Sequence, residues 1–430
     1  MRIVILLVVQ MATLLASAKT NISHPQYIPW NVSSIEITKV VTDDKTTTLY
    51  FRCEGQQGTR ITVDSECFLS DEQDRRYRAV STKGIVLDSV FVYDKKGSGV
   101  FSISFEPLPQ NTKVFDFVEN LHGWNSFRFY MIHDKKSEAA LKKRLKSRNS
   151  PNYSFPAEAF HADSVVIRGR VTGKRVFDRL SRASLYNLSL RLNNYDYARQ
   201  YLPTITTVER DGTFEMHTST MGPAWAHIYY PHYGGFLIPV FLWPGDTIDL
   251  DVEHFGESHQ KIHYRSHHEE CNRLMNLCFA QDMYIRSDAV DNLPEEQMVE
   301  ICKRQLADYM LLCRYFTDKY QFTPTEQTLL EYDFQMYVWQ RLLRNLYEKD
   351  NQTGLFDNSY STDEGRLTEW RQYNMRPVYN FLASMPNTNA MFAVPRCERF
   401  LSTLQLSRLF RDCSPFYIPE YQDGRSMGSS

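Results

Sequence analysis

The sequence lacks the short motifs on which several common enzyme chemistries depend. It has no Cys-x-x-Cys pair, no Gly-x-Ser-x-Gly turn, no Gly-x-x-x-x-Gly-Lys-Ser/Thr loop and no Gly-x-Gly-x-x-Gly. These patterns supply a redox thiol pair, a nucleophilic serine, or backbone amides that hold phosphates. Without them the sequence gives no ground for naming a catalytic residue or a cofactor. We therefore expect a protein that is not an enzyme.

The chain also lacks a strong net charge and a long apolar run. Its 49 Lys and Arg and 51 Asp and Glu give a formal charge of -2. This balance provides no overall attraction to nucleic acid or to an anionic membrane, so we expect no nucleic-acid partner. No stretch after the N-terminus reaches the roughly 20 apolar residues of a membrane span, and we expect no integral span.

The first residues have the pattern of a secretion signal. Arg2 is followed by an apolar run from Ile3 to about Ala16, and Ala16-Ser17-Ala18 provides the small-x-small pattern at which signal peptidase cleaves. We expect residues 1–18 to be a signal peptide. The mature protein would then lie in the periplasm or cell envelope, with protein partners there.

Strand-like sequence fills two long segments, residues 29–133 and 163–253. Short runs rich in Val, Ile, Thr, Tyr and Phe alternate with turn residues, and residues 100–105 show the two-residue period of a half-buried strand. Asp211-Gly212 lies between two such runs and predicts a hairpin. We expect two all-β, sandwich-like domains.

A basic segment, residues 134–162, separates these two domains. Its positive charges are consistent either with an anionic partner or with a solvated linker, and Ser, Asn and Pro just downstream favour the linker. The basic residues are Lys135, Lys136, Lys142, Lys143, Arg144, Lys146 and Arg148.

Helical periodicity replaces strand periodicity after the second segment. Thr323, Pro324 and Glu326 form a capping box that predicts a helix N-terminus. We expect an all-α helical domain over residues 260–415 and a disordered tail over 416–430. The predicted fold class is thus multidomain α and β.

The stretch "FLWPGDTIDLDV", residues 241–252, contains three aspartates. Pro244-Gly245 has the composition of a tight turn, and Asp249 and Asp251 fall on one face of the following strand. A Ca²⁺ site requires further oxygen ligands at loop positions. We therefore expect a turn between two strands, with these carboxylates facing solvent.

A histidine-rich segment follows at residues 259–270. A Zn²⁺ or Ni²⁺ site would require a continuous helix here and a second shell orienting each imidazole. Asn272 occupies the place of the second His of the zinc-protease motif. We therefore expect no metal, although the candidate ligands are His259, His263, His267, His268, Glu269 and Glu270.

An aromatic cluster lies in "MGPAWAHIYYPHYGGF", residues 221–236. Such rings can stack on a glycan or peptide, but aromatic residues of a sandwich more often form its core. Both interpretations remain open. The possible ligand-contact residues are Trp225, Tyr229, Tyr230 and Tyr233, with Phe236 beside them.

The order of several motifs resembles one bacterial family. The series is similar to the N-terminal, non-catalytic part of secreted TlpA-like, thioredoxin-fold disulfide reductases of Gram-negative, Bacteroidetes-type bacteria, across about residues 29–411. It consists of "FEPLP" at 105–109, "IRGRVTG" at 167–173, "ERDGTFE" at 209–215 and "WPGDTIDLDV" at 243–252.

The family's redox centre is a Cys-x-x-Cys in a thioredoxin domain, which the eight cysteines of this chain do not form. The resemblance therefore implies no catalytic residue here. We expect a secreted, non-catalytic binding or scaffold protein. The alternatives are a component of a thiol–disulfide oxidoreductase whose thioredoxin domain is lost or separately encoded, and a glycan- or peptide-binding module.

Overall fold

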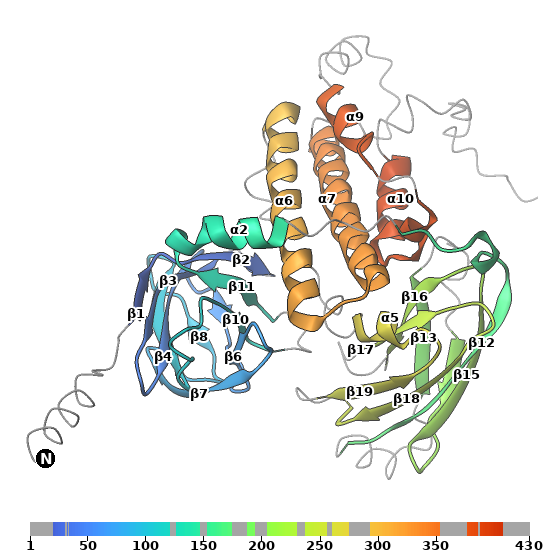
Figure 1. Cartoon of the computed structure of the whole chain (residues 1–430), viewed down its shortest axis with the longest axis horizontal. Coiled ribbons are helices and arrows are strands. Elements are labelled where there is room, and N and C mark those ends of the chain that lie inside the picture. Colours follow the sequence, from blue (N-terminus) through green and yellow to red (C-terminus); the bar gives the residue numbers. More distant parts are fainter. Residues whose placement is uncertain are drawn as a thin grey trace, which may run out of the picture.

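The structure is a computed structural model in which strands dominate the first part of the chain and helices the C-terminal part (Figure 1). This confirms the coarse expectation of a strand-rich chain followed by helices. The expected signal peptide and tail lie outside the described residues. The structure describes residues 20–30, 32, 34–120, 126–146, 153–173, 187–193, 204–229, 237–255, 260–274, 293–352, 376–385 and 388–406.

The first β region is one curled sheet in which every pair of neighbouring strands is antiparallel. It begins at Thr20, before the expected boundary at residue 29. The strands, in sheet order, are β1 (Thr20–Ser23), β3 (Ile35–Thr42), β4 (Thr47–Glu54), β9 (Ser98–Phe105), β7 (Arg76–Lys83), β6 (Phe68–Asp71), β10 (Val114–Val118), β11 (Arg128–His133) and β2 (Gln26–Trp30).

Alternating side chains fill the interior of this sheet. On β4, Leu49, Phe51 and Cys53 are buried while Tyr50 and Arg52 are exposed. A small sheet of β5 (Arg60–Ile61) and β8 (Phe91–Val92) lies beside it, with Phe91 packed on this core. The two-residue period is the same for one curled sheet and for two stacked sheets, so sequence alone does not separate them.

Part of the expected linker is a packed helix. The Asp134 side chain accepts a hydrogen bond from the Lys136 amide, which begins the short helix η1 (Lys135–Ser137), and α2 (Glu138–Lys146) follows. Leu141 and Leu145, one turn apart, are buried against the helical core. Where we expected solvated linker, residues 138–146 therefore cover α6, described below.

The second β region contains two four-stranded sheets around one core. One sheet has the order β15 (Thr213–Thr220), β12 (Asp163–Val171), β18 (Thr247–Glu253), β19 (Lys261–Arg265). The other has the order β14 (Thr204–Thr207), β13 (Asn187–Asn193), β16 (Ala224–Tyr229), β17 (Leu237–Leu242). Strand β12 runs parallel to β18 and antiparallel to β15.

The Asp211-Gly212 turn exists, but the predicted hairpin does not. Gly212 has φ +89°, and its amide donates to the Glu209 carbonyl at 2.9 Å. Strand β14 pairs with β13, whereas β15 pairs with β12, so the turn connects the two sheets. Local residues determine the backbone angles of the turn, and packing determines which strands pair.

The stretch 241–252 is the predicted turn between two strands. Gly245 has φ +80°, and the Asp246 amide donates to the Trp243 carbonyl at 3.1 Å. After the turn, Ile248, Leu250 and Val252 point inward and are at most 1% exposed. This part of the sequence interpretation is confirmed.

The helices are α5 (Glu269–Leu274), α6 (Glu295–Tyr320), α7 (Pro324–Gln352), α9 (Arg376–Leu382) and α10 (Arg396–Leu406), with short η2 (Ala157–Ala159) and η5 (Asn389–Ala393). The predicted capping box is confirmed. The Glu326 amide donates to Thr323 Oγ1 at 3.2 Å, and the Thr323 amide donates to Glu326 Oε2 at 2.7 Å.

The helices share one apolar core with both β regions. The buried cluster around α6 and α7 includes residues from both β regions. The curled sheet contributes Trp30 and Tyr130, and the second region contributes Trp225 and Phe241. Figure 1 shows these helices standing above and between the two β regions. None of the helices that the structure describes is both long and apolar enough to cross a membrane.

Candidate functional site

The thiols that the structure describes are buried, each at most 3% exposed. Burial raises the pKa of Cys53 to about 11 and that of Cys67, Cys302 and Cys397 to about 12. A thiol with such a pKa is almost fully protonated at neutral pH and is a poor nucleophile. The remaining members of this set are Cys271 and Cys313, while Cys278 and Cys413 lie outside the described residues.

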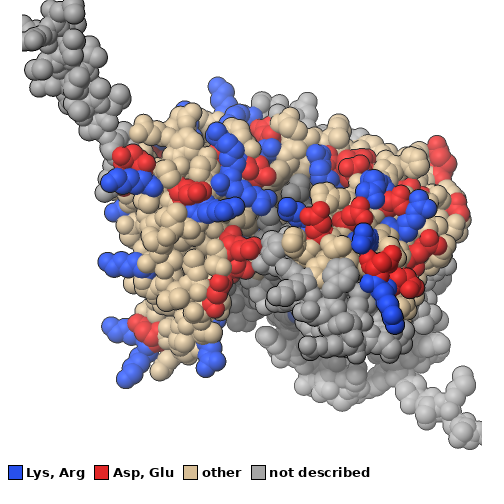
Figure 2. Space-filling model, turned by 90° about the horizontal axis from the view of Figure 1, so that it is seen from below, with Lys and Arg blue, Asp and Glu red and all other residues tan. Residues whose placement is uncertain are grey.

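The three aspartates of residues 241–252 separate into two environments. Asp249 and Asp251 lie on the outer face of β18, paired with Arg168 and Arg265 respectively. The hydrogen bond from Arg168 lowers the pKa of Asp249. One row of alternating charge crosses the sheet, and it consists of Glu215, Arg168, Asp249 and Arg265. Figure 2 shows acidic and basic residues intermixed on this part of the surface, at the right.

Asp246 is buried instead, with its side chain 2% exposed. Its Oδ1 accepts hydrogen bonds from the Thr247 amide at 2.8 Å and pairs with His267 Nδ1 at 3.0 Å. The carboxylate thus ties the turn after β17 to the segment before α5. The other oxygen, Oδ2, is buried and accepts no hydrogen bond from a described residue.

The histidines of the candidate metal cluster diverge in space. His263 lies on β19 opposite Asp251, His267 is 90% exposed, and His268 stacks on Trp243 with ring centroids 4.1 Å apart. Glu269 and Glu270 begin α5, and His259 is outside the described residues. Within the described ranges no three His, Cys, Asp or Glu side chains come together as metal ligands.

The aromatic cluster contributes to the core where the structure describes it. Trp225 is 0% exposed and packs on Phe241 with ring centroids 5.2 Å apart. Tyr229, at the end of β16, is partly buried. Tyr230, Tyr233 and Phe236 lie outside the described residues. Because its ring faces the interior, Trp225 offers no surface on which an external ligand can stack.

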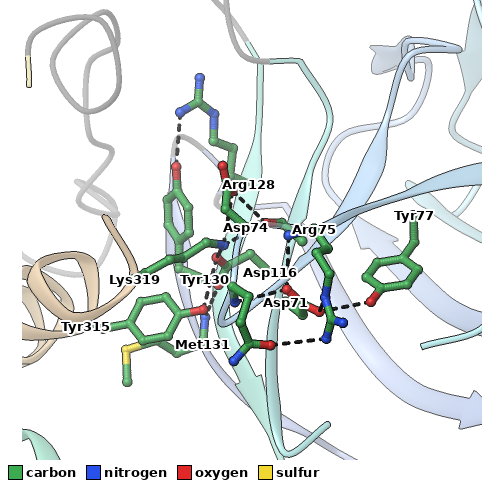
Figure 3. A network of polar contacts seen from close by, with 12 residues as sticks. Asp71, Asp74, Arg75, Tyr77, Asp116, Arg128, Tyr130, Met131, Tyr315 and Lys319 are labelled. Carbon is green, nitrogen blue, oxygen red and sulfur yellow. Dashed lines mark hydrogen bonds and ion pairs between the residues drawn. The ribbon is translucent and has the colours of Figure 1, made fainter. Parts of the chain in front are cut away.

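A buried ion pair joins the curled sheet to α6 (Figure 3). Lys319 Nζ lies 2.6 Å from Asp116 Oδ2 and 2.7 Å from Ser70 Oγ, and both charged side chains are 1% exposed. The Tyr315 hydroxyl donates to the same Asp116 oxygen at 3.2 Å. The other oxygen accepts from the Met131 amide at 2.8 Å. Both carboxylate oxygens are satisfied.

The loop after β6 completes this network. Asp71 accepts hydrogen bonds from Arg75 Nε at 2.7 Å and from the Tyr77 hydroxyl at 2.9 Å. Burial disfavours its charge, but the hydrogen bonds from Arg75 and Tyr77 outweigh burial and lower the pKa of Asp71. The contacts of Lys319 with Asp116, Ser70 and Asp74 hold the sheet against the helix.

An open cleft lies between the curled sheet, at β2, β3 and β4, and the helix α6. Its volume is about 360 Å³. The sheet side contributes Tyr27, Ile28, Pro29, Val32, Ser34, Ile35, Glu36, Arg52 and Glu54, and the helix contributes Gln305, Asp308 and Tyr309. Clefts of this size between structural units are common ligand sites.

Charged groups line the cleft. Arg52 lies 2.7 Å from Glu36 and 3.2 Å from Glu54, and all three side chains are at least 42% exposed. On the helix, Gln305 Oε1 is shielded from solvent and accepts no hydrogen bond from a described residue. Sequence reasoning missed this cleft, because its two walls are about 250 positions apart and neither contains a recognisable motif.

Comparison with known proteins identifies no relative. No protein-family model matches the chain, and no curated protein matches it.

Proposed function

We propose that the protein is a non-catalytic binding or scaffold protein of the cell envelope, built from a curled β-sheet region, a second β region of two sheets and a helical region. The observation that carries this proposal is the state of the thiols. Every described cysteine is buried, and the resolved pKa shifts are upward. Thiol–disulfide exchange requires an accessible thiolate, which these residues do not provide.

Polar contacts between the curled sheet and α6, and among the helices, also support a scaffold role. Lys319 joins α6 to Asp116 of the curled sheet, and Arg273 of α5 makes a bidentate contact with Glu326 of α7, at 2.7 and 2.8 Å through Nη2 and 3.0 Å through Nε. Arg396 of α10 pairs with buried Asp333 of α7. Buried charges whose partners are fixed by the fold favour one arrangement of the units. The sequence resemblance to TlpA-like proteins and the signal-like N-terminus support the envelope location in this proposal.

Thiol accessibility and insulin reduction test the proposal together. The Cys278→Ser/Cys413→Ser variant retains only the thiols that the structure describes. We expect no rapid reaction of the native variant with Ellman's reagent, and reaction of all six thiols after denaturation. We also expect the wild-type chain to leave the rate of insulin reduction by dithiothreitol unchanged.

Turnover of insulin by the wild-type chain above the dithiothreitol rate would contradict the proposal. If that turnover disappeared in the double variant, the redox chemistry would belong to Cys278 or Cys413. Rapid labelling of the native double variant would show instead that the buried thiols are accessible in solution.

A further inference from the structure

We propose that the cleft between β2–β4 and α6 binds a single alkylammonium or guanidinium group, such as the side chain of a lysine or arginine in a peptide. This inference rests on the proposed binding function and names its ligand class. Three features of the cleft support it, namely its balance of charge, its hydrogen-bond acceptors and the side chains of its walls.

The charged lining of the cleft is predominantly acidic. Glu36, Glu54 and Asp308 provide three carboxylates, and Arg52 provides the one guanidinium. Arg52 is already shared between the two glutamates, at 2.7 and 3.2 Å. An anionic ligand would meet a net negative charge and a guanidinium that is already paired, so the electrostatics favour a cation.

The helix wall presents a buried amide oxygen without a donor among the described residues and an exposed carboxylate. Gln305 and Asp308 are three positions apart on α6 and therefore lie on one face. Gln305 Oε1 is shielded from solvent and unpaired within the described part of the chain. Asp308 has neither a hydrogen bond nor an ion pair with any described residue, and Lys142 and Arg304 act on it only at longer range.

An ammonium or guanidinium ligand can donate hydrogen bonds to these acceptors and replace the water around Asp308. Both groups carry several N–H donors and a positive charge, which matches an amide oxygen beside a carboxylate. A neutral apolar ligand would leave the same acceptors without partners. Desolvation by the surrounding protein raises the pKa of Asp308, and a bound cation would oppose that shift.

The remaining walls suit the hydrocarbon stem of such a side chain. Tyr27, Ile28, Val32 and Ile35 line the sheet side, and Tyr309 lines the helix side. The Tyr27 hydroxyl accepts a hydrogen bond from the Ile37 amide at 3.2 Å, which fixes its ring. Aromatic rings attract cations through their faces, and alkyl stems pack on apolar walls. The volume of about 360 Å³ fits one side chain.

Calorimetry with short probes tests the inference. The cationic probes are the peptides acetyl-Gly-Arg-Gly-amide and acetyl-Gly-Lys-Gly-amide and the free diamine cadaverine, and the controls carry norleucine or glutamate at the central position. We expect saturable binding of the cationic probes to the full chain and none of the controls. Binding of the peptides identifies a protein side chain as the source of the cation, whereas binding of cadaverine alone identifies a free amine.

Two substitutions locate the binding in the cleft. Asp308→Asn keeps the shape of the side chain and removes its charge, and we expect it to weaken binding at least about tenfold, as loss of a charge-assisted hydrogen bond does. Glu54→Gln on the opposite wall should also weaken binding. Glu300→Gln, exposed on α6 outside the cleft, is the matched control and should leave affinity unchanged.

Absence of saturable binding by every cationic probe would overturn the inference, as would equal affinity of wild type and Asp308→Asn. Circular dichroism establishes that each variant is folded. The two proposals fail separately. Insulin turnover would contradict the non-catalytic function whatever the cleft binds, and a cleft that binds no cation leaves the thiol result intact.

Discussion

Glu119 is a carboxylate placed in an apolar core. It follows β10, is 8% exposed, and accepts hydrogen bonds from the Phe127 amide at 3.0 Å and the Asp64 amide at 3.3 Å. Burial raises the pKa of Glu119 from 4.5 to about 7, and the two hydrogen bonds only partly oppose this effect. The shift therefore makes stability depend on pH, with a loss of stability as the pH approaches neutrality.

The sign of the pH dependence follows from this shift. Between about pH 4.5 and about pH 7 the folded chain binds a proton at Glu119 that the unfolded chain has lost. The contribution is fully present below the unfolded pKa and disappears as the pH rises through the folded one. Between pH 5 and pH 8 we expect the wild type to lose unfolding free energy on the order of 3 kcal/mol through Glu119. In Glu119→Gln this loss should be absent.

Urea titrations of wild type and Glu119→Gln at the two pH values measure this difference. The comparison uses the slope with pH, so a uniform destabilisation by the amide does not affect it. Glu66→Gln, at an exposed site near the same core, is the control. An unchanged slope in Glu119→Gln would mean that Glu119 is ionised throughout this range.

The aspartates of residues 241–252 show how far residue-level prediction reached. The turn and the outward direction of Asp249 and Asp251 followed from Pro-Gly and from strand period. The burial of Asp246 did not, because it depends on His267, which is 21 positions away and reaches the turn only in the folded chain. The walls of the cleft escaped prediction for the same reason, at far greater separation.

At the scale of single elements, local patterns predicted where helices begin better than what they pack against. The capping box at Thr323 was found from four residues. Helix α2 was missed because its lysines and arginines dominate the composition, although Leu141 and Leu145 form a buried stripe. A helix with one narrow apolar stripe and a basic outer face has the composition of a solvated linker.

The capping box allows a graded prediction. Thr323→Ala removes one hydrogen bond from the start of α7 and should lower the unfolding free energy by about 1 kcal/mol. Glu326→Ala should lower it further, because the 0% exposed carboxylate also makes the bidentate contact with Arg273 of α5. Thr403→Ala, exposed on α10, is the control. Urea unfolding would refute this order if Thr323→Ala were the more damaging change.

At the scale of the whole molecule, the three cores are not independent. The helical core includes Trp30 from one β region and Trp225 from the other, both at most 1% exposed. The ion pair of Lys319 and Asp116 fastens the curled sheet to α6. We therefore expect the wild-type transitions followed by tryptophan fluorescence and by far-ultraviolet circular dichroism to coincide.

Lys319→Met should separate these transitions. The substitution leaves Asp116 buried without its cation, which costs about 3–5 kcal/mol and loosens the curled sheet first. Adding Asp116→Asn should recover part of this loss, since the uncompensated charge is removed. Lys303→Met, at an exposed site on α6, is the control. If the fluorescence and circular dichroism transitions of Lys319→Met coincided, at the same urea concentration as in the wild type, the pair would not couple the units.

The contact between Lys319 and Asp116 also sets an order of events in biosynthesis. The two residues are 203 positions apart, so a ribosome adding about 5–20 residues per second makes the lysine roughly 10–40 seconds after the aspartate. During that interval the nascent curled sheet carries an acidic side chain whose cation has not yet been translated. The first β region therefore reaches its final form only after most of the polypeptide has left the ribosome.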